Sequence, residues 1–348
     1  MNKNKVIWHE GLFLRPQHFQ QQDRFLQHWI EQRCQGLIPY SWGITDIDID
    51  HHALSLGKVS INYCRGIFPD GTPFEIPDTT PPPEALTVTD EIKNSHIYLA
   101  LPITQNNTLE VASPESKYHA LSRYHTQDLS LKDWHTENLD SEADLQVGTL
   151  NIKLLTDQDK QHGFVTIPLV QVIERNNEDE VKLNPNFITS TLHCQASPSL
   201  MAFIKEIQGL LKHRSETLAH RIANPSSNGL AEITDFLLLH TINRAENTFR
   251  HLISLDHLHP ETFYRAALEL AGELATFTCK DRRAITLPHY IHHDLQACFI
   301  PVMDEIRRAL SFVNEQRAIP IELTLRKFGV WVGIFKDKSL LDSAMFVL

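Results

Sequence analysis

Two groups of histidines could supply ligands to a metal ion. They are His289, His292 and His293 with Asp294 beside them, and His251, His257 and His259. Neither group has H-E-x-x-H or another spacing that is typical of a zinc site. Histidine is also common near helix ends, as a polar or capping residue. We favour that interpretation, so the sequence predicts no metal and no cofactor, and a metal-dependent hydrolase stays as a minor alternative.

A cluster of carboxylates could be a paired acid–base site of the kind used for glycoside hydrolysis. Its members are Asp133, Glu137, Asp140, Glu142 and Asp144. No periodic pattern accompanies them, so we interpret the stretch as a solvated loop. The nearest approach to a phosphate-binding loop, residues 66–72, lacks the required lysine, and dinucleotide-binding and nucleophile-elbow motifs are absent from the sequence. The sequence therefore predicts a protein that is not an enzyme.

Composition excludes several other classes of protein. The chain has 348 residues, 42% of them hydrophobic, and a net charge of −11. These values predict a globular protein of several domains with no nucleic-acid partner. The five cysteines are scattered, which fits a reducing compartment. Apolar runs are too short for a membrane span or a signal peptide, so we expect a cytoplasmic protein without direct membrane insertion.

The spacing of apolar residues divides the chain into parts of different secondary structure, and the distribution of charge differs between these parts too. Residues 1–197 hold 15 basic and 26 acidic residues, whereas residues 198–348 hold 17 of each. In the first part, an alternating pattern predicts β-strands. These strands are expected at residues 46–50, 59–64, 97–103, 149–155 and 163–173. We predict an α+β protein that begins with an antiparallel β-sandwich domain at residues 1–196.

Apolar residues recur every three or four positions from residue 197 onward, which predicts amphipathic helices. Four stripes occupy residues 200–222, 230–252, 263–277 and 295–313, the last with a kink expected at Pro301. They predict a four-helix bundle at residues 197–317. In the second helix Leu238, Leu239 and Ile242 fall outside the main stripe, so we expect them to contact a neighbouring subunit.

Alternation returns near the end of the chain, at residues 319–326 and 330–334. It predicts the first strands of a third, β-containing domain at residues 318–348. An apolar string at residues 344–348 would be a poor exposed terminus, so we expect this domain to be incomplete.

The most unusual segment is residues 6–27, with the sequence VIWHEGLFLRPQHFQQQDRFLQ. One interpretation is structural: an N-terminal strand, a turn at Pro16, and a helix that covers one open end of the sandwich. The other is a contact surface, because aromatic residues and arginine are typical anchors of protein interfaces. The polar residues set between the aromatic ones favour a surface that serves both packing and binding.

This segment resembles the opening signature of the TssK family, a baseplate component of the bacterial type VI secretion system. The resemblance rests on WHEGLFLRPQHFQ at residues 8–20, followed by Asp23, Arg24 and Phe25. The motif is long and specific, although only about the first 30 residues carry it. The predicted order of domains agrees with the shoulder, neck and head of that family, whose shoulder is similar to phage receptor-binding proteins.

The resemblance implies a non-enzymatic homotrimer that links the baseplate wedge to the inner-membrane complex. The shoulder would bind the wedge proteins TssF and TssG, and the head would bind TssL and TssM at the cytoplasmic face of the inner membrane. The residues that match the motif, and that we expect to contact the wedge, are Trp8, Phe13, Leu14, Arg15, Pro16, His18 and Phe19. A phage-tail-like carbohydrate-binding or hydrolytic protein remains the alternative from another class.

Overall fold

The structure is a computed structural model of the chain. It describes residues 3–105, 109–113, 115–116, 120–133, 135, 141–159, 162–176, 179–223, 229–311, 323–326 and 330–333. Most of the third domain expected at residues 318–348 lies outside these ranges, as do Glu137 and Asp140 of the acidic stretch.

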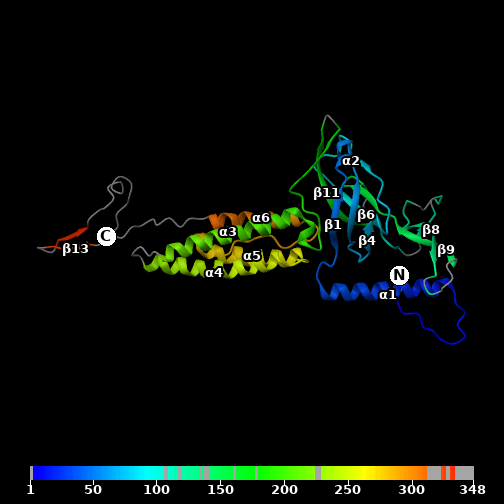
Figure 1. Cartoon of the computed structure of the whole chain (residues 1–348), viewed down its shortest axis with the longest axis horizontal. Coiled ribbons are helices and arrows are strands. Elements are labelled where there is room, and N and C mark those ends of the chain that lie inside the picture. Colours follow the sequence, from blue (N-terminus) through cyan, green and yellow to red (C-terminus); the bar gives the residue numbers. More distant parts are fainter. Residues whose placement is uncertain are drawn as a thin grey trace.

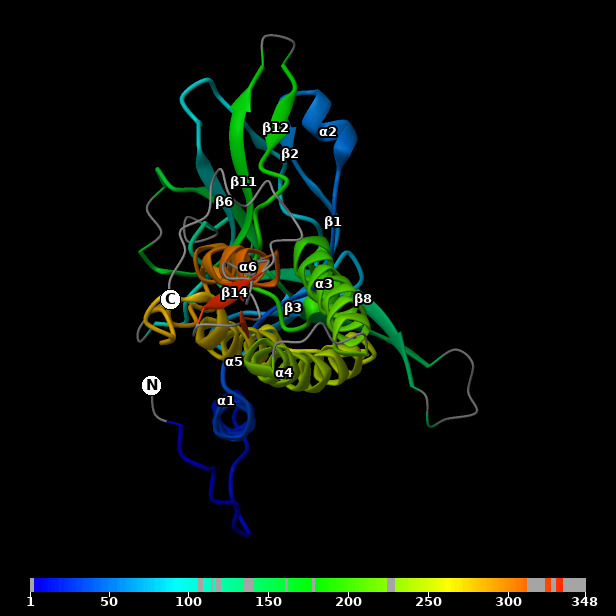
Figure 2. The same cartoon turned by 90° about the vertical axis from the view of Figure 1, so that its left-hand side faces the viewer.

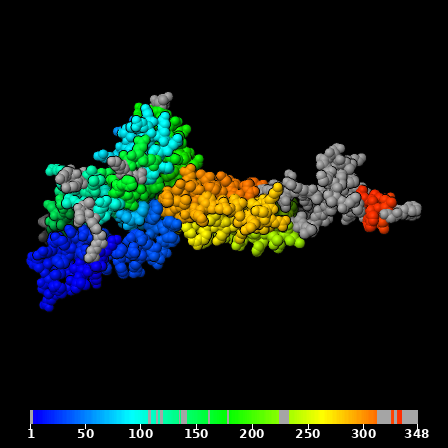
Figure 3. Space-filling view, turned by 180° about the vertical axis from the view of Figure 1, so that it is seen from behind, coloured from blue at the N-terminus to red at the C-terminus, as the bar shows by residue number. Residues whose placement is uncertain are grey.

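The described part of the chain is elongated. Figure 1 shows the sheets gathered at one end, in a part that we call the β-domain (residues 43–196). Four long helices, which we call the helical rod (residues 197–311), extend away from it. A small hairpin of β13 (Leu323–Leu325) and β14 (Trp331–Gly333) lies at the opposite end. Helix α1 (Pro16–Leu37) lies alongside the β-domain, and the view from behind in Figure 3 shows the same order.

The β-domain contains four sheets, and the first two described here share its hydrophobic core. The first has the order β1 (Gly43–Ile49), β3 (Ile61–Ile67), β4 (Pro73–Ile76). The second has the order β10 (Lys153–Thr156), β6 (Ser95–Pro102), β11 (Phe164–Arg175), β12 (Val181–Leu183). The other two sheets are β2 (Lys58–Val59) with β5 (Leu86–Thr87), and β7 (Val111–Ala112), β8 (Tyr124–Lys132), β9 (Glu142–Leu150). Among the described strands, only β7 and β8 pair in parallel.

One hydrophobic core is shared by the first two sheets. Its residues alternate along β6, and a register shift between β1 and β3 lets both Ile61 and Cys64 reach it. Its members include Ile61 and Cys64 of β3, Ile97, Leu99 and Leu101 of β6, and Ile167 of β11. The predicted strands at residues 46–50, 97–103 and 163–173 are confirmed. The strand expected at residues 149–155 is divided between the end of β9 and β10, and the one at 59–64 between β2 and β3.

Two short elements connect these strands to their surroundings. Asp50 begins helix α2 (His51–Ser55) by accepting hydrogen bonds from the backbone N–H groups of His52 and Ala53, at 2.9 and 3.1 Å. At the start of β1, the Ile44 N–H donates to the carbonyl of Ser190, 2.8 Å away. The 3-10 turn η1 (Cys194–Ala196) then leads into the rod. The chain thus passes beside β1 on its way to the helices.

The rod consists of α3 (Pro198–Ala223), α4 (Gly229–Ile253), α5 (Pro260–Thr278) and α6 (Leu295–Ser311). All four predicted helices are confirmed, and α6 continues through Pro301. Each helix contributes side chains to one shared core, including Leu211, Ile242, Phe263 and Phe299. On the outside, the Arg307 guanidinium of α6 donates to both carboxylate oxygens of Glu206 on α3, at 2.7 and 2.8 Å.

No helix among the described residues is both long enough and apolar enough to cross a membrane.

Candidate interaction surfaces and the joint between them

The N-terminal signature folds into a compact group at the beginning of α1. Residues 9–12 form a turn in which Gly11 has φ of +80°, so the segment before it returns along the helix. The Trp8 ring then lies near the rings of His18 and Phe19, at 6.2 and 6.3 Å between centroids. His18 Nδ1 accepts a hydrogen bond from the backbone N–H of Arg15 and so helps to begin the helix. Of the predicted wedge-binding residues, the structure thus brings Trp8, His18 and Phe19 together.

These side chains do not belong to the core of the β-domain. Phe13 is 79% exposed and Phe19 is 55% exposed, and α1 buries none of its 22 residues. No strand precedes α1 among the described residues. Of the structural interpretation, the helix that follows Pro16 is confirmed as α1, whereas the N-terminal strand is not formed among the described residues. Helix α1 lies alongside the β-domain, but the core of that domain includes no residue of α1.

Helix α1 has its polar side toward its own chain and its apolar side toward solvent. Leu26, Trp29, Ile30 and Leu37 follow one another at helical spacing, and all four are exposed. We call them the α1 stripe. The other side of the helix lines a groove against the β-domain, mainly with polar side chains that include Arg24, Gln27, His28, Glu31 and Gln35, although Ile30 of the stripe also borders this groove. A helix in this orientation has its main apolar surface available to another molecule.

The groove between α1 and the β-domain has a volume of about 1050 Å³. Across it, Arg24 lies 3.5 Å from the carboxylate of Glu110. The far wall contains Arg123, whose buried guanidinium donates to Asp70 at 2.7 Å and to the carbonyl of Pro102 at 2.6 Å. Arg123 was not identified from the sequence, because nothing in its neighbourhood indicates that this arginine is buried. It fixes the wall of the groove.

A second notable cluster lies at the joint between the β-domain and the rod. His292 is 2% exposed, and its Nε2 donates to the backbone carbonyl of Trp42 at 2.8 Å. With Nε2 protonated, Nδ1 accepts from the Tyr290 hydroxyl at 2.7 Å. Burial lowers the pKa of His292 to about 4. This histidine is therefore neutral near neutral pH and acts as a donor to the connection between α1 and β1.

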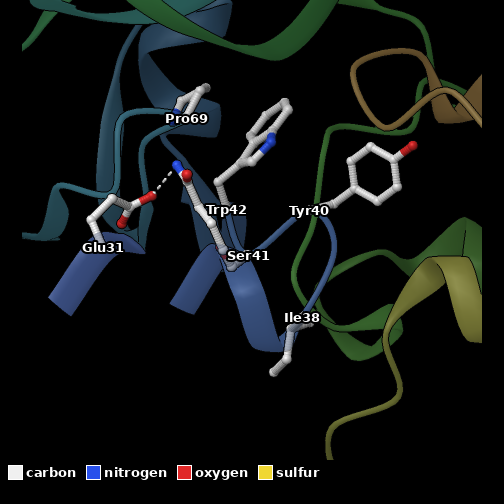
Figure 4. Close-up of a pocket in the computed structure, with 7 residues that line it drawn as sticks. Glu31, Ile38, Tyr40, Ser41, Trp42 and Pro69 are labelled. Carbon is white, nitrogen blue, oxygen red and sulfur yellow. Dashed lines mark hydrogen bonds between the residues drawn. The ribbon is translucent and has the colours of Figure 1, made fainter. Parts of the chain in front are cut away.

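His259 makes a parallel contact one residue before α5. Its Nδ1 accepts from the backbone N–H of Glu261 at 3.1 Å, so Nε2 donates to the carbonyl of Tyr40 at 3.2 Å. The rings of His259 and His292 stack at 5.5 Å. Figure 4 shows the α1–β1 connection from its other side, where it borders a hollow of about 210 Å³ lined by residues that include Glu31, Tyr40 and Pro69. The rod thus holds this connection at two carbonyls.

The histidine groups do not form a metal site in the part of the chain that the structure describes. His289 and His293 are exposed, whereas His292 is buried, so the three do not share one face. His257 instead lies against His193, with ring centroids 4.5 Å apart. In the acidic stretch, Glu142 and Asp144 belong to strand β9 and not to the predicted loop.

The subunit contact expected from α4 needs a correction. Ile242 is 0% exposed and Leu238 is 8% exposed, and both belong to the core of the rod, against which Leu239 also packs. The apolar pattern of α4 is wide, and it therefore predicts a second apolar face beside the main stripe. In the structure α3 and α5 flank the helix on two sides, so both faces are covered at these residues. The exposed apolar residues of α4 among those described are Ile233, Phe236 and Leu237.

Comparison with known proteins identifies the family. Residues 18–348 match the model of the bacterial type VI secretion family that includes EvfL, ImpJ and VasE. The chain therefore belongs to this family.

Individual relatives agree with this result. The chain is 39% identical over 345 residues to the type VI secretion system baseplate component TssK1 of Pseudomonas aeruginosa, covering 99% of this chain and 77% of that protein. A crystal structure of TssK matches with a TM-score of 0.87 and 33% identity, over 98% of this chain and 76% of that one. A chain of the type VI baseplate complex matches with a TM-score of 0.77 and 25% identity, over 89% and 100%.

Proposed function

We propose that this chain is a structural, non-enzymatic subunit of a type VI secretion baseplate. The observation that carries the proposal is the similarity to TssK1 along 99% of the chain. TssK also occurs in a solved TssK-TssF-TssG baseplate subcomplex, whose similarity to this chain, at 24% identity, supports the fold alone. We accordingly assign TssF- and TssG-like wedge proteins as the partners.

The wedge contact is assigned to the signature group at the beginning of α1. Trp8, Phe13, Leu14 and Phe19 supply exposed apolar surface, and the side chain of Arg15 lies 6.0 Å from the centroid of the Phe13 ring. Large apolar side chains beside an arginine resemble the anchors on which binding energy concentrates in protein interfaces. Pro16 and His18 begin the helix that presents them. Together these residues form an anchor site on the surface of the part of the chain that the structure describes.

The rest of the chain suits a connector. The rod is held by a continuous core and separates α1 and the β-domain from the β13–β14 hairpin (Figure 1). In this proposal the β-domain is a shoulder at residues 1–196, the rod is a neck at residues 197–317, and residues 318–348 begin a head. The head would contact TssL- and TssM-like proteins at the cytoplasmic face of the inner membrane.

We further propose that the working unit is a homotrimer. The α1 stripe and the signature group leave much apolar surface uncovered in one copy, which is uncommon for a protein that acts as a monomer. Three copies presented together would also raise the apparent affinity for the wedge, since binding of the second and third sites becomes intramolecular. In these two proposals the signature group contacts the wedge, and the α1 stripe contacts a neighbouring copy.

The test is copurification with TssF- and TssG-like proteins encoded with this chain. The double variant Arg15→Ala/His18→Ala should lower the affinity for the wedge by ~1–3 kcal/mol while the trimer and the melting temperature stay unchanged. Because His18 also helps to begin α1, Phe13→Ser provides a second variant that leaves the helix start intact. Full wedge binding by both variants would assign the signature to folding alone.

A matched control removes the same residue types elsewhere. Arg283→Ala/His289→Ala changes two exposed residues of the segment between α5 and α6, far from α1 in sequence and on the rod. This control should bind the wedge as the wild type does. Equal loss of binding in the control and in Arg15→Ala/His18→Ala would show that the effect is one of net charge and not of the signature.

A further inference from the structure

Four histidines gather at the joint between the β-domain and the rod. His193 lies in the segment that leads into the rod, and His292 lies between α5 and α6. His257 and His259 lie between α4 and α5. The ring centroids of His193 and His257 are 4.5 Å apart, and those of His259 and His292 are 5.5 Å apart. Figure 2, which looks along the rod, shows the strands of the β-domain on one side of it and α1 on the other.

The joint connects two parts that are packed independently. The core of the β-domain and the core of the rod share no residue. The chain passes from the first part to the second in the segment before α3. The rod also holds the connection between α1 and β1, through the bonds of His259 and His292 to two backbone carbonyls. Loss of these two bonds would leave both cores intact, so the joint can open while each part stays folded.

His259 cannot take up a proton without losing a contact. It is the N-cap of α5, and its Nδ1 accepts a hydrogen bond from the backbone N–H of Glu261 at 3.1 Å. A protonated Nδ1 would direct one N–H group at another, and a backbone N–H cannot accept a hydrogen bond. The positive end of the α5 dipole also disfavours a cation at this position. Protonation would therefore turn the ring away from Glu261, and Nε2 would leave the carbonyl of Tyr40.

His292 is the second contact that a proton would disturb. It is 2% exposed, and both of its ring nitrogens are engaged, Nε2 with the carbonyl of Trp42 and Nδ1 with the hydroxyl of Tyr290. A proton on Nδ1 would reverse the bond to Tyr290 and bury a positive charge. Burial accordingly lowers the pKa of His292 to about 4, and burial also lowers the pKa values of His259 and His193.

The charged groups around these rings do little to favour protonation. The Glu261 carboxylate near His259 opposes the lowering of its pKa, but both of its oxygens already accept from the Arg265 guanidinium, at 2.7 and 2.8 Å. Asp256 and Asp294 are exposed, and Asp294 caps α6 by accepting from the N–H of Ala297 at 3.0 Å. The other titratable groups that face the joint are neutral near neutral pH or are histidines: Tyr40, Cys194, Tyr264, Tyr290, His293 and Cys298.

The histidines also oppose one another. His257 and His259 add to the lowering of the pKa of His193, and His259 and His293 add to that of His292. A first proton at the joint therefore makes a second one less favourable while the rings stay together. Separation of the rings would relieve this repulsion.

We propose that the joint opens when its histidines take up protons from solvent. In the closed form the neutral rings of His259 and His292 hold the carbonyls of Tyr40 and Trp42. In the open form the rings are solvated, and the β-domain with α1 turns relative to the rod about the segment before α3. This inference goes beyond the proposed function and depends on neither the wedge nor the trimer, so either one can fail while the other stands.

The opening has a defined pH range. Solvation in the open form returns the pKa of His292 from about 4 to its ordinary value of 6.5, so the open form binds the proton more tightly. The closed form is fully favoured above about pH 6.5 and loses stability as the pH falls toward 4. From about pH 7.5 to about pH 5, His292 alone should shift the equilibrium toward the open form by about 30-fold.

Spin labels on the two sides of the joint would measure the opening. Leu56→Cys in the β-domain and Thr248→Cys on α4 replace two exposed residues, and Cys34→Ser/Cys279→Ser removes the cysteines that are not buried. An excess of unlabelled chain restricts the measured distance to labels within one copy. Pulsed electron paramagnetic resonance should give one narrow distance distribution at pH 7.5 and a second, broader population at pH 5. Circular dichroism should be the same at both pH values, because both cores stay folded.

Two results of this measurement would overturn the proposal. One is the same narrow distribution at both pH values, which would mean that the joint stays closed. The other is a loss of circular dichroism at pH 5 together with the broader distribution, which would mean that acid unfolds the chain and does not open the joint.

A variant without the titrating groups tests whether the histidines are responsible. His259→Asn keeps an N-cap acceptor, and His292→Gln keeps an amide donor for Trp42. The double variant should keep the narrow distribution at pH 5, and His292→Gln alone should open less than the wild type. The matched control His52→Asn/His240→Gln changes two exposed histidines outside the joint and should open as the wild type does. Equal opening of the wild type and of both joint variants at pH 5 would also overturn the proposal.

Discussion

The imidazole of His292 donates a hydrogen bond from Nε2 to the backbone carbonyl of Trp42, 2.8 Å away and 250 residues earlier in the chain. Trp42 belongs to the short connection between α1 and β1, and His292 lies three residues before α6. With the contact of His259 to Tyr40, this bond joins the rod to the segment that carries the signature. Two histidines of the rod therefore contact the backbone of the connection between α1 and β1.

Acidification should destabilise this joint. Burial depresses the pKa of His292 to about 4, below its ordinary value of 6.5, so the unfolded chain binds the proton more tightly than the folded one. Stability is then lost as the pH falls from the ordinary value toward the depressed one. From about pH 7 to about pH 5 we expect His292 to account for a loss of about 2 kcal/mol in the free energy of unfolding.

The measurement is denaturant unfolding of the wild type and of His292→Gln at both pH values. The glutamine amide can still donate to Trp42 but does not titrate. His259 and His293 lie near His292 and oppose its protonation, and they remain in the variant. The variant should lose less stability on acidification than the wild type. An equal loss in the two proteins would mean that His292 does not couple folding to pH.

Gly43 should be intolerant of any side chain. Its φ of +130° is rare for other residues, and an added Cβ would lie 2.9 Å from the carbonyl oxygen of Ser190. Gly43→Ala should lower the free energy of unfolding by ~1–3 kcal/mol, because the strand and the linker would have to separate. As a control, Gly209→Ala in α3 meets nothing within 4 Å and should be neutral or slightly stabilising.

Ile242 should act on the stability of the rod. It is fully buried between helices, so Ile242→Ala should cost ~2–4 kcal/mol of unfolding free energy through lost burial and a cavity. Leu237, five residues earlier on the exposed side of α4, should change stability by less than about 0.5 kcal/mol when it is replaced by alanine. Comparable effects of the two substitutions in chemical denaturation would contradict the observed packing.

Periodicity in the sequence predicted the regular elements of the core. Apolar residues at three- and four-residue spacing located α3 to α6, and alternation located β1, β6 and β11. The pattern could not say which side of a helix is covered when most sides are apolar. For this reason the pattern predicts a subunit contact for Ile242. The structure places this residue in the core of the rod instead.

The sequence likewise predicted only part of the candidate site. The types of residue at positions 8–19 predicted a binding surface, and the exposure of Phe13 and Phe19 fits that prediction. The orientation of α1 could not be predicted, because its amphipathic pattern is the same whether the apolar side faces the chain or solvent. The role of His292 could not be predicted either, because its partner is a backbone carbonyl and no sequence pattern indicates such a contact.

The most direct test of the account is the mass of the purified chain in solution, measured by light scattering at micromolar concentration. The account predicts a single species with three times the 39.9 kDa of one chain. Such a trimer would agree with a connector that exposes its signature to the wedge and covers its α1 stripe with a neighbouring copy. A species of 39.9 kDa over the whole concentration range would contradict the trimer on which the proposed function depends.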